Sequence, residues 1–204
     1  MFLYLISFGI ALLIALDVHE ASHAFMANYL GDPTARLMGR LTLNPLAHLD
    51  PLGTLVFILT ALAGFPIGWG KPVIFDPYNL KDPKRDAALT SLAGPASNLI
   101  LASIVSLLFR FYPAPILESL IILNVSLAIF NLIPIHPLDG GKILIALLPE
   151  KEGRQYDLFL NKYGAFILLL LILPIAGGQS IISNIISPII NAILKIFLSG
   201  LSVV

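Results

Sequence analysis

The sequence FLYLISFGIALLIALDVHEASHAFMANYL at residues 2–30 is apolar except for the polar run DVHEASH at residues 17–23. The segment is long enough to cross a bilayer, which takes about 20 residues of α-helix. Each charged side chain at the centre of such a helix costs about 3 kcal/mol on insertion scales. Something must therefore compensate for the polar run, and a bound metal ion would do so.

The polar run contains the pattern H-E-x-x-H, formed by His19, Glu20 and His23. Residues four apart lie on one face of an α-helix, about 6 Å apart along the axis, so both histidines can reach one ion. Glu20 can face the same centre and act on a metal-bound water instead of binding the metal. The alternative is a chance match on a helix whose polar residues are satisfied by neighbouring helices. The cost of charge in an apolar helix makes that alternative the weaker one.

The composition is that of a polytopic membrane protein. The 204 residues are 57% hydrophobic and 12% charged, and the mean hydropathy is +0.91. Equal numbers of acidic and basic residues, and the lack of a basic run, give no reason to expect a nucleic-acid partner. The chain has no cysteine, so its metal ligands must be histidine and carboxylate. Residues 1–16 lack the basic n-region and cleavage site of a signal peptide and are expected to form a retained helix.

Six apolar segments predict an all-α fold with five to six membrane segments. They span residues 2–30, 51–67, 87–112, 116–133, 163–176 and 181–198. Segments 51–67 and 163–176 are marginal in length for a crossing.

Basic residues indicate the orientation of these segments. Arg36 and Arg40 follow the first segment. Four basic residues precede or begin the third segment, namely Lys71, Lys81, Lys84 and Arg85. Four more follow the fourth segment, namely Lys142, Lys151, Arg154 and Lys162. Placing these loops in the cytoplasm satisfies the positive-inside tendency. Segment 51–67 would then begin and end on one side, so it is expected to be re-entrant or to lie at the membrane face, although a crossing stays open. Residues 69–78 are expected to form an extended stretch, a strand or hairpin at the membrane edge, between the first and third segments.

Two histidines do not complete a catalytic zinc site, which typically has three protein ligands and a water. Asp139 is the best third ligand, in the stretch NLIPIHPLDGG at residues 131–141, where two prolines break the fourth segment. If the first and fourth segments both run toward the cytoplasm, Asp139 lies at a depth similar to that of His19 and His23. The alternative is an aspartate that caps the turn after a helix.

Three motifs together resemble those of the site-2 protease family of intramembrane zinc metalloproteases. They are H-E-x-x-H at residues 19–23, AGPASN at 93–98 and the stretch at 131–141. The sequences GRLTLNPLAHLDPLG at 39–53 and GWGKPV at 68–73 are similar to the compact prokaryotic branch, which lacks PDZ and CBS domains. The resemblance covers about residues 15–144.

The resemblance implies one Zn²⁺ per chain, bound by His19, His23 and Asp139, with Glu20 as the general base. It also implies that Asn131 and Asn98 hold the scissile peptide or its oxyanion. Asn98 could equally join neighbouring helices. His136 could be a spare ligand, a hydrogen-bond donor behind the ligands, a gate or an interfacial histidine, and His48 is expected to be a loop hydrogen-bonder unless it contacts metal or substrate.

The expected protein is a single membrane-embedded domain over residues 1–204, with a catalytic core at about 1–148 and C-terminal helices at about 163–200. Its expected substrate is a transmembrane segment of another protein in the lipid bilayer. The expected location is a prokaryotic cell membrane, crossed several times, with the active site toward the cytoplasm. The alternative function is a metal-binding membrane protein or transporter, because intramembrane His and Asp also mark ion pathways. The sequence does not indicate an oligomeric state.

Overall fold

The computed structural model describes residues 2–62, 69–174 and 180–198. In these ranges the chain forms helices and two isolated β-bridges but no strand, which confirms an all-α fold class for the described part. The helices are α1 (Phe2–Leu30), α2 (Thr34–Leu37), α3 (Pro45–His48), α4 (Pro51–Leu62), η1 (Pro77–Asn79, a 3-10 helix), α5 (Pro83–Phe109), α6 (Pro115–Asn131), α7 (Asp139–Leu147), α8 (Glu150–Ile172) and α9 (Ile181–Leu198).

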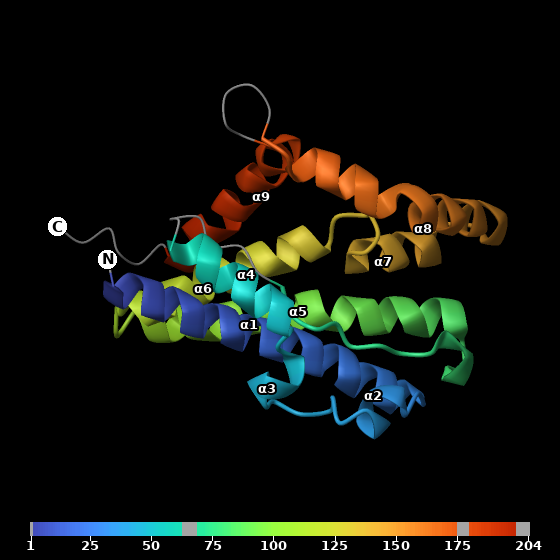
Figure 1. The fold of residues 1–204 in the computed structure, drawn as a ribbon, viewed down its shortest axis with the longest axis horizontal. Coiled ribbons are helices and arrows are strands. Elements are labelled where there is room, and N and C mark those ends of the chain that lie inside the picture. The colour runs from blue at the N-terminus through green and yellow to red at the C-terminus, as the bar shows by residue number, and fades with distance from the viewer. Residues whose placement is uncertain (1, 63–68, 175–179, 199–204) are drawn as a thin grey trace.

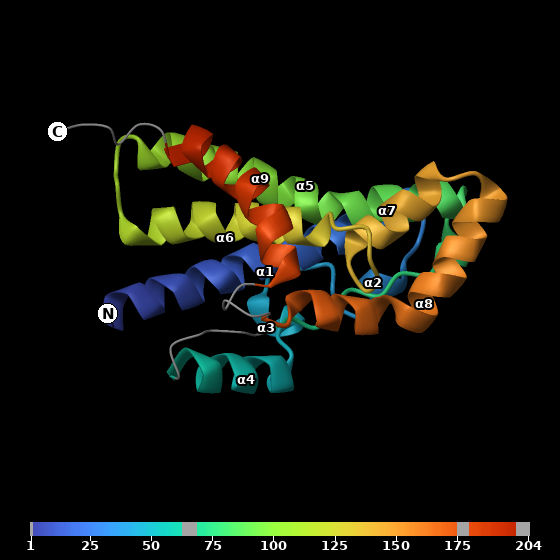
Figure 2. The same cartoon turned by 90° about the horizontal axis from the view of Figure 1, so that it is seen from above.

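Helices α1, α5 and α6 pack against one another and form the core (Figures 1 and 2). Helices α1 and α6 run in the same direction and α5 runs in the opposite one (Figure 2). Buried side chains from all three helices meet between them, namely Ala11, Ala102, Val105, Phe109, Leu120, Ile121 and Val125. The shared direction of α1 and α6 is what the argument from basic residues requires for Asp139 to meet the histidines.

Local sequence sets where α1 ends and α5 begins. Gly31 follows α1 with a φ of 115°, a left-handed conformation that commonly ends helices and suits glycine. The Asp82 side chain accepts a hydrogen bond from the Arg85 N–H at 3.2 Å, and Pro83 occupies the first turn of α5. Helix α5 therefore starts before the predicted segment 87–112, because hydropathy does not detect its polar first turn.

Within the described ranges, four helices are long and apolar enough to cross a membrane. They are residues Ile6–Leu30 of α1, and α5, α8 and α9. Helix α6 is also apolar but has only 17 residues. Large apolar side chains such as Ile100, Ile104 and Leu169 are exposed on these helices, as on a surface that faces lipid. The chain is therefore a membrane protein, and the number of its crossings stays a prediction.

Helix α4 lies in the predicted segment 51–67. Its 12 residues extend about 18 Å, less than the hydrocarbon thickness of about 30 Å. Figure 2 shows α4 set apart from the three-helix core. Residues 63–67 of the predicted segment lie outside the described residues, so a re-entrant path stays a prediction.

Residues 69–76 form neither a helix nor a strand, and we call them the strap. The strap makes one antiparallel bridge, between Leu49 and Gly70, and residues 77–79 then turn into η1. The expected strand or hairpin at 69–78 is therefore not formed within the described part of the chain. Pro72 and Pro77 lack the N–H that a continuous ladder would need.

Helices α7 and α8 differ from the apolar segments predicted for the C-terminal half. No predicted segment covers α7, and α8 begins before segment 163–176. Helix α7 follows the proline-broken loop and packs against α5 and α8. Glycine is required at its start, because a Cβ on Gly140 would lie 2.3 Å from the Leu132 carbonyl oxygen. Helix α8 begins at Glu150, well before residue 163, because a polar helical half precedes its apolar half.

Candidate metal centre

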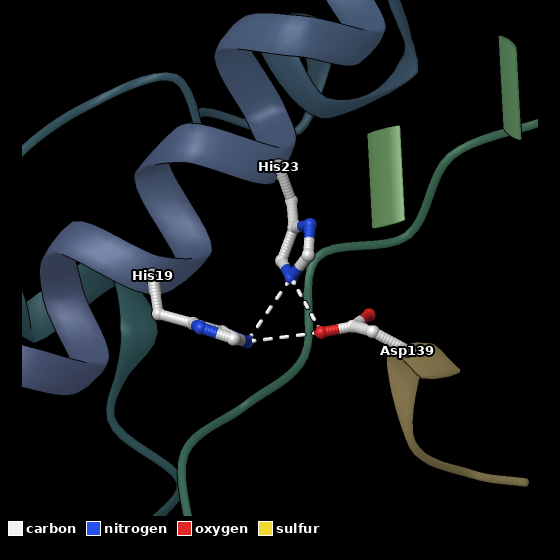
Figure 3. Close-up of side chains that lie close together, drawn as sticks. All are labelled: His19, His23 and Asp139. Atoms are coloured by element: carbon white, nitrogen blue, oxygen red, sulfur yellow. Dashed lines mark hydrogen bonds and ion pairs between the residues drawn. The ribbon is translucent and has the colours of Figure 1, made fainter. Parts of the chain in front are cut away.

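Three possible ligand atoms meet at one point between α1 and the start of α7 (Figure 3). The Nε2 atoms of His19 and His23 are 3.1 Å apart, and each lies 3.2 Å from Oδ2 of Asp139. A tetrahedral zinc ion with bonds of about 2.0–2.1 Å places its ligand atoms about 3.3 Å apart. The three observed separations are close to that value. Within the described residues, this is the one group of His, Asp and Glu side chains that could hold a metal.

The other ring nitrogen of each histidine indicates which atoms carry protons. His23 Nδ1 lies 2.7 Å from the Thr90 carbonyl oxygen, which can only accept, so Nδ1 must donate. His19 Nδ1 lies 2.6 Å from Asn98 Oδ1 and donates in the same way. In the neutral rings both Nε2 atoms then carry bare lone pairs directed at Asp139.

Asp139 places a carboxylate oxygen, Oδ2, opposite the two Nε2 atoms. Its Oδ2 is buried and has no hydrogen-bond partner in the described structure. Two unprotonated nitrogens and a carboxylate oxygen repel one another unless a cation lies between them. The donor set of two imidazoles and one carboxylate suits Zn²⁺ and leaves a fourth position for water. The residues present therefore fit a zinc ion.

Asn98 is fully buried beside His19, and both hydrogens of its side-chain amide are donated to protein acceptors. Its Nδ2 donates to the Ala15 carbonyl at 2.9 Å and to Asn124 Oδ1 at 2.7 Å. These two bonds turn Oδ1 toward His19. No amide hydrogen is left for a substrate oxyanion, so the contacts differ from those expected for a substrate-binding residue.

Asn124 was not singled out from the sequence. It is fully buried in α6 and anchors Asn98, and its own Nδ2 donates to the Leu120 carbonyl at 2.8 Å. The signal that could have identified it is a lone asparagine in an apolar helix, since such residues need a partner in the membrane.

Gly94 lets α5 approach the two histidines closely. A Cβ at this position would lie 2.4 Å from His23 Nε2 and 2.7 Å from His19 Cε1. Only a hydrogen fits in that space. The glycine in the AGPASN motif is therefore explained by the contact between α5 and the ligand rings.

Glu20 follows His19 on α1 and is half-buried. Its Oε2 accepts a hydrogen bond from the Val73 N–H of the strap at 2.7 Å. Its other oxygen, Oε1, accepts no hydrogen bond from the residues that the structure describes. One oxygen is thus fixed by the strap, and the other has no hydrogen-bond partner among the described residues.

The remaining predicted residues lie outside the ligand group. Asn131 is half-buried at the end of α6, and its Nδ2 donates to the Leu127 carbonyl at 3.0 Å. His136 lies 3.2 Å from Asp157 Oδ1, through Nε2, and links the broken loop to α8. His48 Nε2 lies 3.0 Å from the Thr42 carbonyl oxygen, as expected of a histidine that holds a loop.

Known proteins with similar sequences are named zinc metalloproteases. The model of the family described as peptidase family M50 matches residues 112–175, which include Asp139 and extend past the predicted resemblance at 15–144. The chain is 38% identical to "Putative zinc metalloprotease YwhC" of Bacillus subtilis (strain 168) over 206 residues, which cover 92% of this chain and 89% of that protein.

More distant relatives carry similar names. The chain is 35% identical to "Putative zinc metalloprotease Rip2" of Mycolicibacterium smegmatis, over 69% of this chain and 57% of that protein. It is 37% identical to "Zinc metalloprotease MJ0392" of Methanocaldococcus jannaschii, over 36% of this chain and 23% of that protein. No solved structure matches the chain. The near full-length similarity to the Bacillus protein and the family match show that this chain belongs to peptidase family M50, the site-2 protease family, and is a metalloprotease.

Proposed function

We propose that this metalloprotease is an intramembrane endopeptidase that uses one Zn²⁺ per chain and cleaves transmembrane segments of other proteins. The meeting of His19, His23 and Asp139 carries the proposal, because both histidines belong to a helix apolar enough to cross the membrane. A ligand set inside such a helix is reached most directly by a substrate that is itself in the bilayer. The family supplies the expectation of a protein substrate.

His19 and His23 would hold the ion through Nε2, and Asp139 would hold it through Oδ2. When bound, Zn²⁺ lowers the pKa of a coordinated water toward about 7 and polarises a carbonyl oxygen. Glu20 takes the proton of the attacking water at Oε1 and passes it to the nitrogen of the leaving peptide. Its Oε2 is held by Val73, so the carboxylate stays oriented while Oε1 exchanges the proton.

We assign different roles to the two predicted asparagines. Asn131 is the proposed donor to the substrate peptide or its oxyanion, because only one of its two amide hydrogens is used, on the Leu127 carbonyl. Asn98 is instead a proposed positioning residue that keeps a proton on His19 Nδ1 and so leaves Nε2 free for the metal.

The proposed location is a prokaryotic cell membrane with the site toward the cytoplasm. Arg36 and Arg40 follow α1 directly, and four further basic residues precede or begin α5, which favours a cytoplasmic position for both loops. The relatives named above come from bacteria and an archaeon.

A substrate helix must also unwind locally, because helical hydrogen bonds occupy its carbonyl groups.

The test uses purified full-length protein in liposomes with a model membrane substrate. We expect Glu20→Gln to abolish cleavage while the protein keeps its zinc, and His23→Ala to lose both. Undiminished cleavage by Glu20→Gln would refute the mechanism. Metal flux across the liposome membrane without cleavage would instead support a transporter.

A further inference from the structure

The strap at residues 69–76 runs past the proposed base Glu20 and is held on both sides of that contact. On the N-terminal side of Val73, the Lys71 N–H donates to the His48 carbonyl at 2.7 Å. On the C-terminal side of Val73, the Asp76 N–H donates to Asp32 Oδ2, also at 2.7 Å. Between these two points, Val73 donates to Glu20. Because no strand lies beside the strap in the described structure, its position depends on such individual contacts.

The first anchor, His48, is buried at the end of α3, in the segment between α1 and α4. Its side chain is 2% exposed, and its Nε2 reaches the Thr42 carbonyl oxygen. The same Nε2 lies 3.6 Å from Asp17 Oδ1, on α1 two residues before His19. The adjacent Leu49–Gly70 bridge joins this loop to the beginning of the strap. The His48 side chain thus holds its own segment through Thr42 and lies against Asp17 of α1, and its backbone carbonyl holds the strap.

The second anchor, Asp32, is fully buried just after α1. Its Oδ1 accepts hydrogen bonds from the Thr34 N–H at 3.0 Å and from Asn79 Nδ2 at 2.8 Å. Its Oδ2 accepts the bond from Asp76. One carboxylate therefore joins the end of α1 to the end of the strap and to η1.

The strap also contacts the element that carries the third ligand. The Lys142 ammonium of α7 lies 4.4 Å from the centroid of the Phe75 ring, within the range of a cation–π interaction. The strap is thus in contact with both helices that supply ligand atoms, α1 through Glu20 and α7 through Lys142.

We propose that His48 and Asp32 are positioning residues for catalysis, which act on Glu20 through the strap and its Val73 N–H. The inference rests on the proposed function of Glu20. A free glutamate side chain samples several rotamers, and only some direct Oε1 toward a water on the metal. A fixed N–H donor holds Oε2 and restricts these rotamers. Loss of an anchor lets the strap move and lowers the fraction of chains with Glu20 in place.

The decisive variant is Val73→Pro, which removes the N–H donor but keeps an apolar side chain in a segment outside the helices. Val73→Ala is its matched control, because it shortens the side chain and keeps the donor. We expect Val73→Pro to have a kcat at least about tenfold below that of Val73→Ala, with KM values that differ by less than about twofold. Zinc content should be one ion per chain in both variants.

The role of His48 is tested by combining its substitution with Val73→Pro, and the role of Asp32 is tested with a single variant. His48→Ala should also lower kcat, and the double variant His48→Ala/Val73→Pro should be no slower than Val73→Pro alone, because both changes act through one hydrogen bond. His48→Gln, which keeps a donor for the Thr42 carbonyl, should restore most of the lost kcat. Asp32→Ala should behave like His48→Ala.

Phe109→Leu controls for general destabilisation. Phe109 is buried in the core at the C-terminal end of α5, more than two helical turns beyond Asn98, so this variant should lower the thermal midpoint but keep kcat. Wild-type kcat in Val73→Pro, multiplying effects in the double variant, or zinc loss in Val73→Pro would each overturn the proposal. Cleavage by Glu20→Gln would show instead that the proposed function itself is wrong.

Discussion

Gly94→Ala should weaken zinc binding without removing any ligand. The added Cβ would lie 2.4 Å from His23 Nε2 and 2.6 Å from His23 Cε1. Non-bonded heavy atoms are comfortable at about 3.5 Å, so the overlap is about 1 Å. The ring cannot rotate away easily, because its Nδ1 is held by the Thr90 carbonyl. Overpacking of this kind costs about 1–3 kcal/mol.

If α5 and the rings move apart to relieve that overlap, the ligand atoms no longer meet at the spacing that zinc requires. The full cost then appears as weaker metal binding, by about 5- to 150-fold, since about 1.4 kcal/mol is a factor of ten. The measurement is competition for zinc with a chromogenic chelator, at one fixed pH because metal binding is coupled to ligand protonation.

The matched control is Gly9→Ala on α1. A Cβ at Gly9 would have its nearest neighbour in the Phe57 ring at 3.9 Å, an ordinary van der Waals contact. We expect this variant to bind zinc like the wild type. A Gly94→Ala protein with wild-type zinc affinity would refute the idea that glycine is needed there to admit the two rings.

Other predictions follow from the contacts around the site. Asn98→Ala should lower zinc affinity about 10- to 100-fold, because losing the partner of a ligand histidine usually has an effect of this size. The measurement is again zinc competition with a chromogenic chelator. Unchanged affinity would count against a positioning role for Asn98. For Asp32, burial raises the pKa of the carboxyl group, but hydrogen bonds from Thr34, Asn79 and the Asp76 backbone outweigh it, and the pKa lies below its ordinary value. A lowered pKa means that Asp32 contributes stability above the unfolded value of about 3.9, and that this stability is lost as the pH falls through the folded value. The wild-type thermal midpoint should therefore fall in that acidic range more steeply than that of Asp32→Asn, and parallel pH profiles would contradict this account.

The sequence predicts the parts of the site that depend on helical spacing and on topology. His19 and His23 share a face of α1 because they are four residues apart, and Asp139 meets them because α6 runs in the same direction as α1. Hydropathy also locates α1, α6 and α9 well, since these helices are apolar along most of their length.

Other contacts depend on quantities that a sequence pattern does not contain. Whether Asn98 reaches His19 or a substrate depends on the rotation of α5 about its own axis, which is set by packing against α1 and α6. The bond between Val73 and Glu20 depends on the path of an irregular segment, which has no periodicity to read. Helix α8 begins earlier than expected because its polar half is helical without being apolar.

The cost of placing a polar run in an apolar helix is met in two ways, on opposite sides of the same two rings. On one side, protein acceptors satisfy the Nδ1 hydrogens of His19 and His23, and the Asn98–Asn124 pair ties that contact to α6. On the other side, the Nε2 atoms of both rings face Asp139 Oδ2, and in neutral rings these atoms repel one another unless a cation lies between them. These protein contacts use only the Nδ1 atoms of the rings, so we expect α5, supported by α6, to hold the rings in metal-free protein as well. In the proposed function, zinc would then bind to a site that the packing of α1, α5 and α6 has already oriented, and this arrangement limits the conformational cost of binding the metal.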